Sequence, residues 1–135
     1  MYTLDEIEGL DFFALDDGEG LPTVASCTVD GVLGYGFLVF TSEEYAHLFR
    51  RLYVPPSEDQ QVRKLVRRQV NGRMIQSDLV RAARKYKTAE LPRPVLAMII
   101  DHGSPAQQVV PLNDVVALGL KQRSHKSAQD ELFNE

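Results

Sequence analysis

Residues 23–40 read TVASCTVDGVLGYGFLVF, and this stretch gives the strongest indication of the fold expected for the chain. Its first part alternates apolar and polar residues with the period of a strand. Asp30-Gly31 follows, and an Asp-Gly pair between two strand-like runs is typical of a tight two-residue hairpin turn. The return segment, residues 32–40, is apolar on both faces toward its end, which indicates a strand inside a sheet. Upstream, residues 11–16 predict a first short strand or the turn that leads into one.

A helix is expected directly after this hairpin. Thr41 and Glu44 have the spacing of a capping box, in which a hydroxyl and a carboxylate satisfy free N–H groups at a helix start. Apolar residues then recur at i, i+3, i+4 and i+7, which predicts one buried helical face. That face would consist of Tyr45, Leu48, Phe49 and Leu52. Pro55-Pro56 would end the helix, because proline lacks an N–H group and clashes with the preceding turn.

Two further helices are predicted in the middle of the chain. Ser57 and Gln60 offer a second capping box for a helix that Asn71-Gly72 would end or bend. The buried face of this helix would consist of Val62, Leu65, Val66 and Val70. Residues 77–87 predict the next helix, with Leu79, Ala83 and Tyr86 on its apolar side.

The last third of the chain supplies the remaining elements. Residues 95–100 (VLAMII) are six consecutive apolar residues and predict a central strand. A turn over 101–106, a short returning strand over 107–110 and a last helix over 111–120 follow. The predicted fold is α+β, with a small mixed or antiparallel sheet of four to five strands packed against three to four helices. Residues 1–120 would form a single domain, and residues 121–135 a flexible C-terminal tail.

The charge of the chain is sorted by position. Residues 1–49 carry ten acidic side chains and no Lys or Arg, residues 50–93 have a net charge of +8, and residues 94–135 have a net charge of −2. The overall charge of −4 therefore hides two opposed fields. The basic block would attract a polyanion, or the two blocks would face each other within one fold.

The basic residues between 63 and 87 are the first candidate binding site. Four of them recur at i, i+1, i+4 and i+5, which on a helix would gather them opposite the apolar face. Such a stripe fits a phosphate backbone, whose counterions are released on binding. The predicted nucleic-acid-binding residues are Arg63, Lys64, Arg67, Arg68, Arg73, Arg81, Arg84 and Lys85. A helix-turn-helix over residues 62–87 and a merely solvated helix face are the alternatives.

The C-terminal residues 129–133 (QDELF) carry the second candidate site. They resemble the short peptides by which replication and repair proteins bind the bacterial sliding clamp, with the pattern Gln-x-x-Leu-Phe. The resemblance implies that Gln129 is a polar anchor and that Leu132 and Phe133 fill an apolar pocket of that partner. The alternative is that Leu132 and Phe133 pack back on the domain.

Two stretches resemble the SseB family, named for enhanced serine sensitivity. Residues 37–49 (FLVFTSEEYAHLF) are similar to its strand, Phe-Thr-Ser and helix start, and residues 97–118 are similar to its later strand, Gly-Ser turn and Pro-led final helix. The family's turn more usually reads Asn-Pro-Gly, whereas Asp101-His102-Gly103 stands here. The resemblance implies a small α+β module without a catalytic centre, and it transfers no functional residues.

Catalytic and metal sites are not expected. The glycines of residues 31–36 precede a strand and not a helix, unlike those of a phosphate-binding loop. Asp101, His102 and Ser104 lie too close in sequence for a catalytic relay. Cys27, the single cysteine, is expected in the core, and it excludes an intrachain disulfide. No His, Cys or carboxylate cluster has metal-ligand spacing, and no cofactor is predicted.

The sequence therefore predicts a non-enzymatic binding protein of the bacterial cytoplasm. No apolar run approaches the roughly 20 residues needed to cross a bilayer, and the N-terminus lacks the basic start and apolar core of a signal peptide. The first hypothesis is an accessory factor of DNA replication, repair or a mobile element, which binds nucleic acid through basic helices and a sliding clamp through its tail. The second is an SseB-like regulatory module for protein–protein interaction with no nucleic-acid role. The opposed charge blocks would also suit a homodimer.

Overall fold

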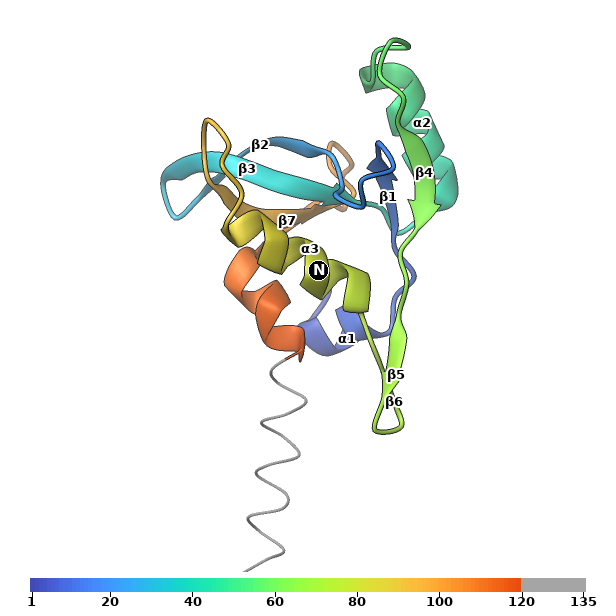
Figure 1. The fold of residues 1–135 in the computed structure, drawn as a ribbon, viewed down its shortest axis with the longest axis vertical. Helices are drawn as coiled ribbons and strands as arrows, with labels where there is room; N and C mark the ends of the chain where they lie inside the picture. The colour runs from blue at the N-terminus through green and yellow to red at the C-terminus, as the bar shows by residue number, and fades with distance from the viewer. Residues whose placement is uncertain (120–135) are drawn as a thin grey trace, which may run out of the picture.

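A four-stranded mixed sheet forms the centre of the molecule (Figure 1). In the computed structural model, which describes residues 1–119, β3 and β7 run parallel and the two outer strand pairs run antiparallel. The strands in spatial order are β2 (Val24–Val29), β3 (Val32–Val39), β7 (Val95–Ile100) and β8 (Gln108–Pro111). The turn between β2 and β3 has Asp30 at φ 49° and Gly31 at φ 78°, the backbone of a tight two-residue hairpin. The predicted α+β class, the hairpin and the interior strand over residues 95–100 are confirmed.

Apolar side chains cover both faces of this sheet. On one face, α1 (Leu4–Glu8), α3 (Ser77–Lys87) and a helix over residues 112–119 pack on Phe37, Met98 and Ile100. On the other face, α2 (Glu43–Tyr53) packs on Leu38 and Ile99 together with β1 (Phe13–Asp16) and β4 (Gln61–Lys64). The alternation of side chains along each strand therefore feeds two separate cores. No helix within the described part of the chain is long and apolar enough to cross a membrane.

The helix predicted over residues 57–70 is wrong. Residues 61–64 form β4 instead, which pairs antiparallel with β1 in the register Phe13↔Lys64 to Asp16↔Gln61. The following residues form a hairpin of β5 (Arg68–Val70) and β6 (Arg73–Ile75) around a turn in which Asn71 has φ 51° and Gly72 φ 79°. Long-range pairing with β1 overrides the local helical spacing, because each residue of β4 gains a backbone partner, and a helix here would leave β1 with only isolated bridges to Phe40 and Pro22. The helix-turn-helix alternative falls with it, since strands occupy its first half.

The helix predicted after Thr41 is present, with two differences. Its N-cap is Ser42, whose hydroxyl accepts a hydrogen bond from the Tyr45 amide, whereas Thr41 donates its hydroxyl to Asp101 at 2.6 Å. Of the predicted apolar face only Phe49 is buried, and Leu52 is 61% exposed. The helix therefore uses a narrower face than its sequence offers, because only one edge of it rests on the sheet.

The helix over residues 77–87 is confirmed with the predicted bounds as α3. Its predicted apolar side is buried against the sheet through Leu79, Ala83 and Tyr86. The ring of Tyr86 stacks on Phe37 of β3, and its hydroxyl donates a hydrogen bond to the Pro22 carbonyl. These contacts fix which face of α3 remains for solvent.

Candidate nucleic-acid interface

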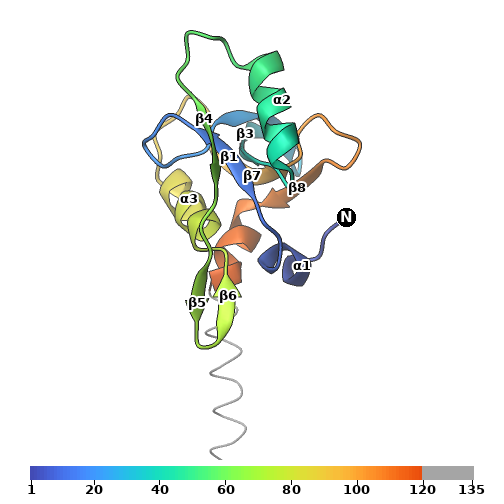
Figure 2. The same ribbon diagram turned by 90° about the vertical axis from the view of Figure 1, so that its right-hand side faces the viewer.

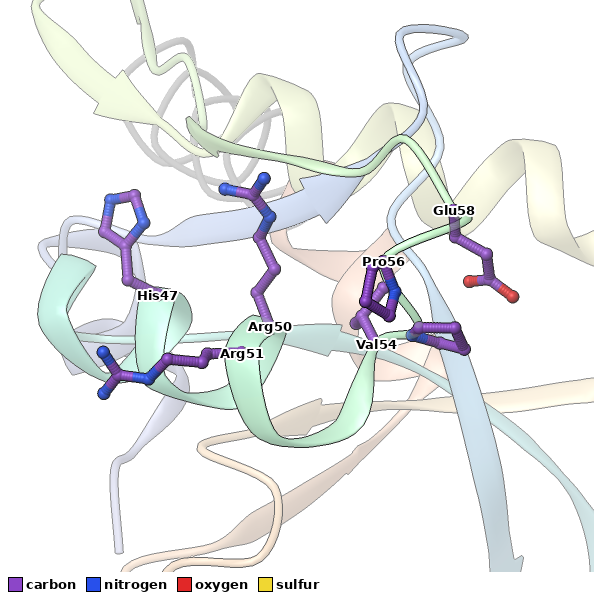
Figure 3. A pocket seen from close by; sticks show the side chains of 7 residues that line it. His47, Arg50, Arg51, Val54, Pro56 and Glu58 are labelled. Carbon is purple, nitrogen blue, oxygen red and sulfur yellow. The ribbon is translucent and has the colours of Figure 1, made fainter.

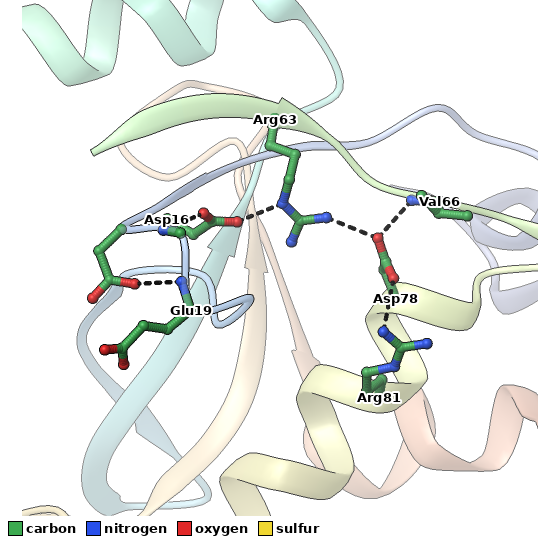
Figure 4. Close-up of polar contacts among 8 residues, drawn as sticks. Asp16, Glu19, Arg63, Val66, Asp78 and Arg81 are labelled. Atoms are coloured by element: carbon green, nitrogen blue, oxygen red, sulfur yellow. Dashed lines mark hydrogen bonds and ion pairs between the residues drawn. The ribbon is translucent and has the colours of Figure 1, made fainter. Parts of the chain in front are cut away.

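Arg63 joins three elements that lie far apart in the sequence (Figure 4). From β4 its guanidinium donates to the carboxylate of Asp16 at the end of β1 and, at 2.9 Å, to that of Asp78 in α3. Asp16 is buried and Asp78 is nearly so, with side chains only 5% and 11% exposed. Burial by itself lowers the pKa of Arg63, but the hydrogen bonds that it donates to the two carboxylates outweigh this effect and raise its pKa. Arg63 is thus a structural cation, and its charge is already used within the fold.

Lys64 and Arg67 are also paired with the acidic N-terminal block. Arg67 donates to the Asp11 carboxylate at 2.9 Å and to the Gly9 carbonyl at 3.3 Å. Lys64 lies 3.8 Å from the same carboxylate. Arg63 and Arg67 are therefore hydrogen-bonded to acids of residues 1–49, as the alternative reading of the charge pattern anticipates, whereas Lys64 makes only a long ion pair with one of these acids.

The hairpin β5–β6 presents the next two predicted cations. It projects away from the sheet and its helices in both views (Figures 1 and 2), and every residue from 68 to 74 is exposed. Arg68 has no ion pair within residues 1–119, and Arg73 makes only a long one, 3.9 Å from Glu8. The hairpin contains no acidic residue. Both guanidinium groups are therefore available to an anionic partner.

The solvent face of α3 presents the remaining predicted cations. Arg81, Arg84 and Lys85 are exposed, and Lys87, which the sequence argument did not select, extends the same face. The one acid on this helix, Asp78, is occupied by Arg63 and by the Val66 amide at 2.7 Å, so its contact with Arg81 is long, at 3.9 Å. We name Arg68, Arg73, Arg81, Arg84, Lys85 and Lys87 the cationic surface.

Gln76 fixes the cationic surface to the rest of the fold, and the sequence argument missed it. Its side chain is 1% exposed and donates to the carbonyls of Ile7 and Leu10 at 3.1 and 2.5 Å. Gln76 links β6 to α3, so these bonds hold the base of the hairpin and the start of α3 against the end of α1. A single polar residue between two elements gives no periodic signal in the sequence. Only the position of Gln76 directly before a predicted helix could have suggested its anchoring role.

A cleft beside α2 is a separate cationic feature (Figure 3). It has a volume of about 430 Å³ and lies between the second half of α2 and residues 54–58. His47, Arg50 and Arg51 line it from the helix, with Glu58 from the loop that follows. Neither arginine has an ion pair within residues 1–119, and Tyr53 beside them is 69% exposed. No binding role was predicted for α2, because its apolar residues at helical spacing indicate a helix that is packed in the core.

The other residues considered for chemistry have structural roles. Asp101 accepts hydrogen bonds from the Thr41 amide and hydroxyl, and the His102 carbonyl accepts one from the Tyr45 hydroxyl. Burial raises the pKa of the Cys27 thiol, which disfavours the reactive thiolate. In residues 1–119 no group of three or more His, Cys, Asp or Glu side chains is placed to hold a metal ion. Gln129, Leu132 and Phe133 lie outside the described residues.

The fold and this surface define a small α+β protein that presents a projecting cationic hairpin beside a cationic helix face. No family model matches the chain, and no curated protein matches it. The resemblance of residues 37–49 and 97–118 to the SseB family therefore stays a prediction.

Proposed function

We propose that this protein binds nucleic acid through the cationic surface. The observation that carries the proposal is that, within residues 1–119, the six cations of this surface make no ion pair or only a long one, while Asp78, the acid of α3, is held by Arg63. Cations that a fold has not neutralised release phosphate counterions when they meet a nucleic acid. The protein is then a binding module and not an enzyme.

Salt dependence is the first test of this proposal. If about four of the six cations each contact a phosphate, the logarithmic salt slope is about −3.6, and affinity for a duplex falls about 150-fold between 50 and 200 mM salt. Fluorescence anisotropy with a labelled 24-base-pair DNA duplex measures this slope directly. A slope near zero, or no binding at 50 mM salt, contradicts the proposal.

A matched pair of charge reversals locates the interface. Arg84→Glu with Lys85→Glu changes the cationic surface, and Arg50→Glu with Arg51→Glu makes the same change in net charge on α2, at the opposite face of the sheet. The first variant should lose most of the affinity, and the second should lose little. Equal losses would mean that only the net charge of the protein matters.

The process that such binding serves is proposed from the tail. Gln129, Leu132 and Phe133 would tether the protein to a sliding clamp, and tethering raises the effective concentration of a weak DNA binder. The role would be that of an accessory factor in DNA replication, repair or a mobile element of the bacterial cytoplasm. Binding of purified clamp to the full chain, but not to a chain that ends at residue 127, tests this part by itself.

The exposed side of α2 favours a second candidate function, a protein–protein interaction module. Leu52 and Tyr53 are exposed beside Arg50 and Arg51, which have no ion pair within residues 1–119, and Tyr and Arg are enriched among the residues that dominate the binding energy of protein interfaces. A partner of the full chain that is lost in Leu52→Asp with Tyr53→Ser, and retained in the Arg84→Glu with Lys85→Glu variant, would favour this function over the first.

A further inference from the structure

The hairpin β5–β6 is built as an arm with a fixed base. Its two strands pair only with each other in the described chain, in the register Arg68↔Ile75 to Val70↔Arg73. The residues on either side of it are joined, because the Val66 carbonyl accepts bonds from the Ser77 hydroxyl at 2.9 Å and from the Asp78 amide at 3.2 Å. An isolated two-stranded hairpin is marginally stable. These bonds at the base therefore orient the arm on α3.

The arm carries side chains that are suited to reading bases. Opposite residues of an antiparallel pair share a face, so Arg68, Val70 and Arg73 lie on one face, and Gln69 and Met74 lie on the other. Asn71 stands at the tip. Arg, Gln and Asn are the residue types whose planar donors and acceptors match the major-groove edges of guanine and adenine. No residue of the arm is buried in the core, so its composition is not explained by packing.

The dimensions of the arm fit the major groove of B-form DNA. Three residues per strand at about 3.4 Å each, followed by a turn, extend about 10 Å or more. The major groove is about 8.5 Å deep and about 12 Å wide, and it admits a two-stranded ribbon. The helix α3 begins directly behind the arm, at Ser77, and its first cation, Arg81, follows one turn later, where phosphates beside the groove would lie.

We propose that the hairpin β5–β6 inserts into the major groove of duplex DNA. Arg68, Gln69 and Arg73 contact base edges there, while Arg81, Arg84 and Lys85 hold the flanking phosphates. This assignment rests on the proposed function, and it adds the ligand class, B-form duplex DNA, and the element that confers sequence preference. A duplex RNA is a poor ligand for such an arm, because the major groove of A-form RNA is deep and narrow.

Selection from a random duplex DNA pool, followed by 7-deazapurine substitution, tests the proposal. The full-length protein should enrich a preferred sequence. Replacing its purines by 7-deaza analogues removes the N7 acceptor from the major groove and leaves the phosphates and the minor groove unchanged. We expect this replacement to weaken binding by about tenfold or more per contacted purine. A duplex RNA of the same sequence should also bind at least about tenfold more weakly.

The variant Arg68→Ala with Gln69→Ala, which lacks two of the proposed base contacts, is compared with the parent protein in the same experiment. Both side chains are exposed, so circular dichroism and thermal unfolding should match the parent. This variant should keep the salt slope of the parent, lose most of the sequence preference, and respond little to 7-deazapurines. If it selects the same sequence as the parent, or if 7-deazapurines leave the parent's binding unchanged, the arm does not read the groove and the inference is wrong. In that case salt-dependent binding that needs Arg84 and Lys85 still supports the proposed function, whereas absence of any DNA binding overturns both.

Discussion

Replacing Arg63 by methionine removes the cation that joins β1, β4 and α3, and it keeps most of the apolar stem. The change leaves the carboxylates of Asp16 and Asp78 without their shared partner, and both are at least 89% buried. Removing one member of a buried ion pair costs about 3–5 kcal/mol, because the remaining charge is buried and unpaired. The Arg63 side chain is 35% exposed, so water screens part of this effect, and we expect a loss of about 3 kcal/mol in the free energy of unfolding.

Denaturant titration followed by circular dichroism measures this loss, with the slope m checked for constancy. For a domain of this size, about 3 kcal/mol corresponds to a decrease in Tm of about 12 °C. Arg63→Lys should recover only part of the loss. Lysine keeps the positive charge, but its ammonium group lacks the planar fork that reaches both carboxylates. A double-mutant cycle with Asp16→Asn should show coupling of more than about 1 kcal/mol.

Arg68→Met is the matched control for stability. It makes the same substitution five residues along the chain, at an exposed arginine without an ion pair in the described residues, and should change stability by less than about 0.5 kcal/mol. If Arg63→Met costs no more than this control, or if the cycle shows no coupling, then Arg63 does not hold the three elements together. The division of the basic residues into structural and available groups would then be wrong.

Three further outcomes follow from single buried contacts. Burial raises the pKa of Tyr86 from 10.0 to about 12, so the folded state holds this proton more tightly than the unfolded state does. As pH rises from about 10 to 12, the wild type should therefore lose stability relative to Tyr86→Phe, by at most about 2.7 kcal/mol. Parallel denaturant titrations of the two proteins measure this loss. Gly34→Ala would place a Cβ 2.5 Å from the Pro94 carbonyl oxygen, so a loss of about 2 kcal/mol is expected, and an unchanged Tm would contradict this packing. Gln76→Met leaves the buried Ile7 carbonyl and the partly buried Leu10 carbonyl without this donor, which should cost about 2–3 kcal/mol and speed amide exchange in α1; unchanged exchange there would argue against the anchor.

Local signals predicted most of the sheet and α3. Local signals for the β5–β6 turn and for α1 are also present in the sequence, but they were misinterpreted or overlooked. Asn71-Gly72 is the same kind of turn signal as Asp30-Gly31, and both adopt positive φ at their two residues. Asn71-Gly72 was interpreted as a helix end because apolar residues at helical spacing precede it. Thr3 and Glu6 form a full capping box for α1, a signal that the sequence argument passed over.

The candidate site was only partly predictable for a different reason. The sequence places Arg63, Arg67, Arg68 and Arg73 in one basic run, and nothing local distinguishes them. Their roles differ because Arg63 and Arg67 meet carboxylates 47 and 56 residues away, whereas the hairpin carries Arg68 and Arg73 out of reach of most acids.

Local patterns in the sequence suffice to predict the strands of the central sheet, the turn between β2 and β3, the bounds of α3 and the opposition of an acidic and a basic block. These features depend on residues a few positions apart, and periodicity and turn chemistry report them directly. The folded chain alone shows that β4, β5 and β6 replace the predicted helix and which cations remain for a partner. Both depend on the pairing of β4 with β1 and on charges brought together from distant parts of the chain, and the free energy of such contacts exists only once the chain has folded.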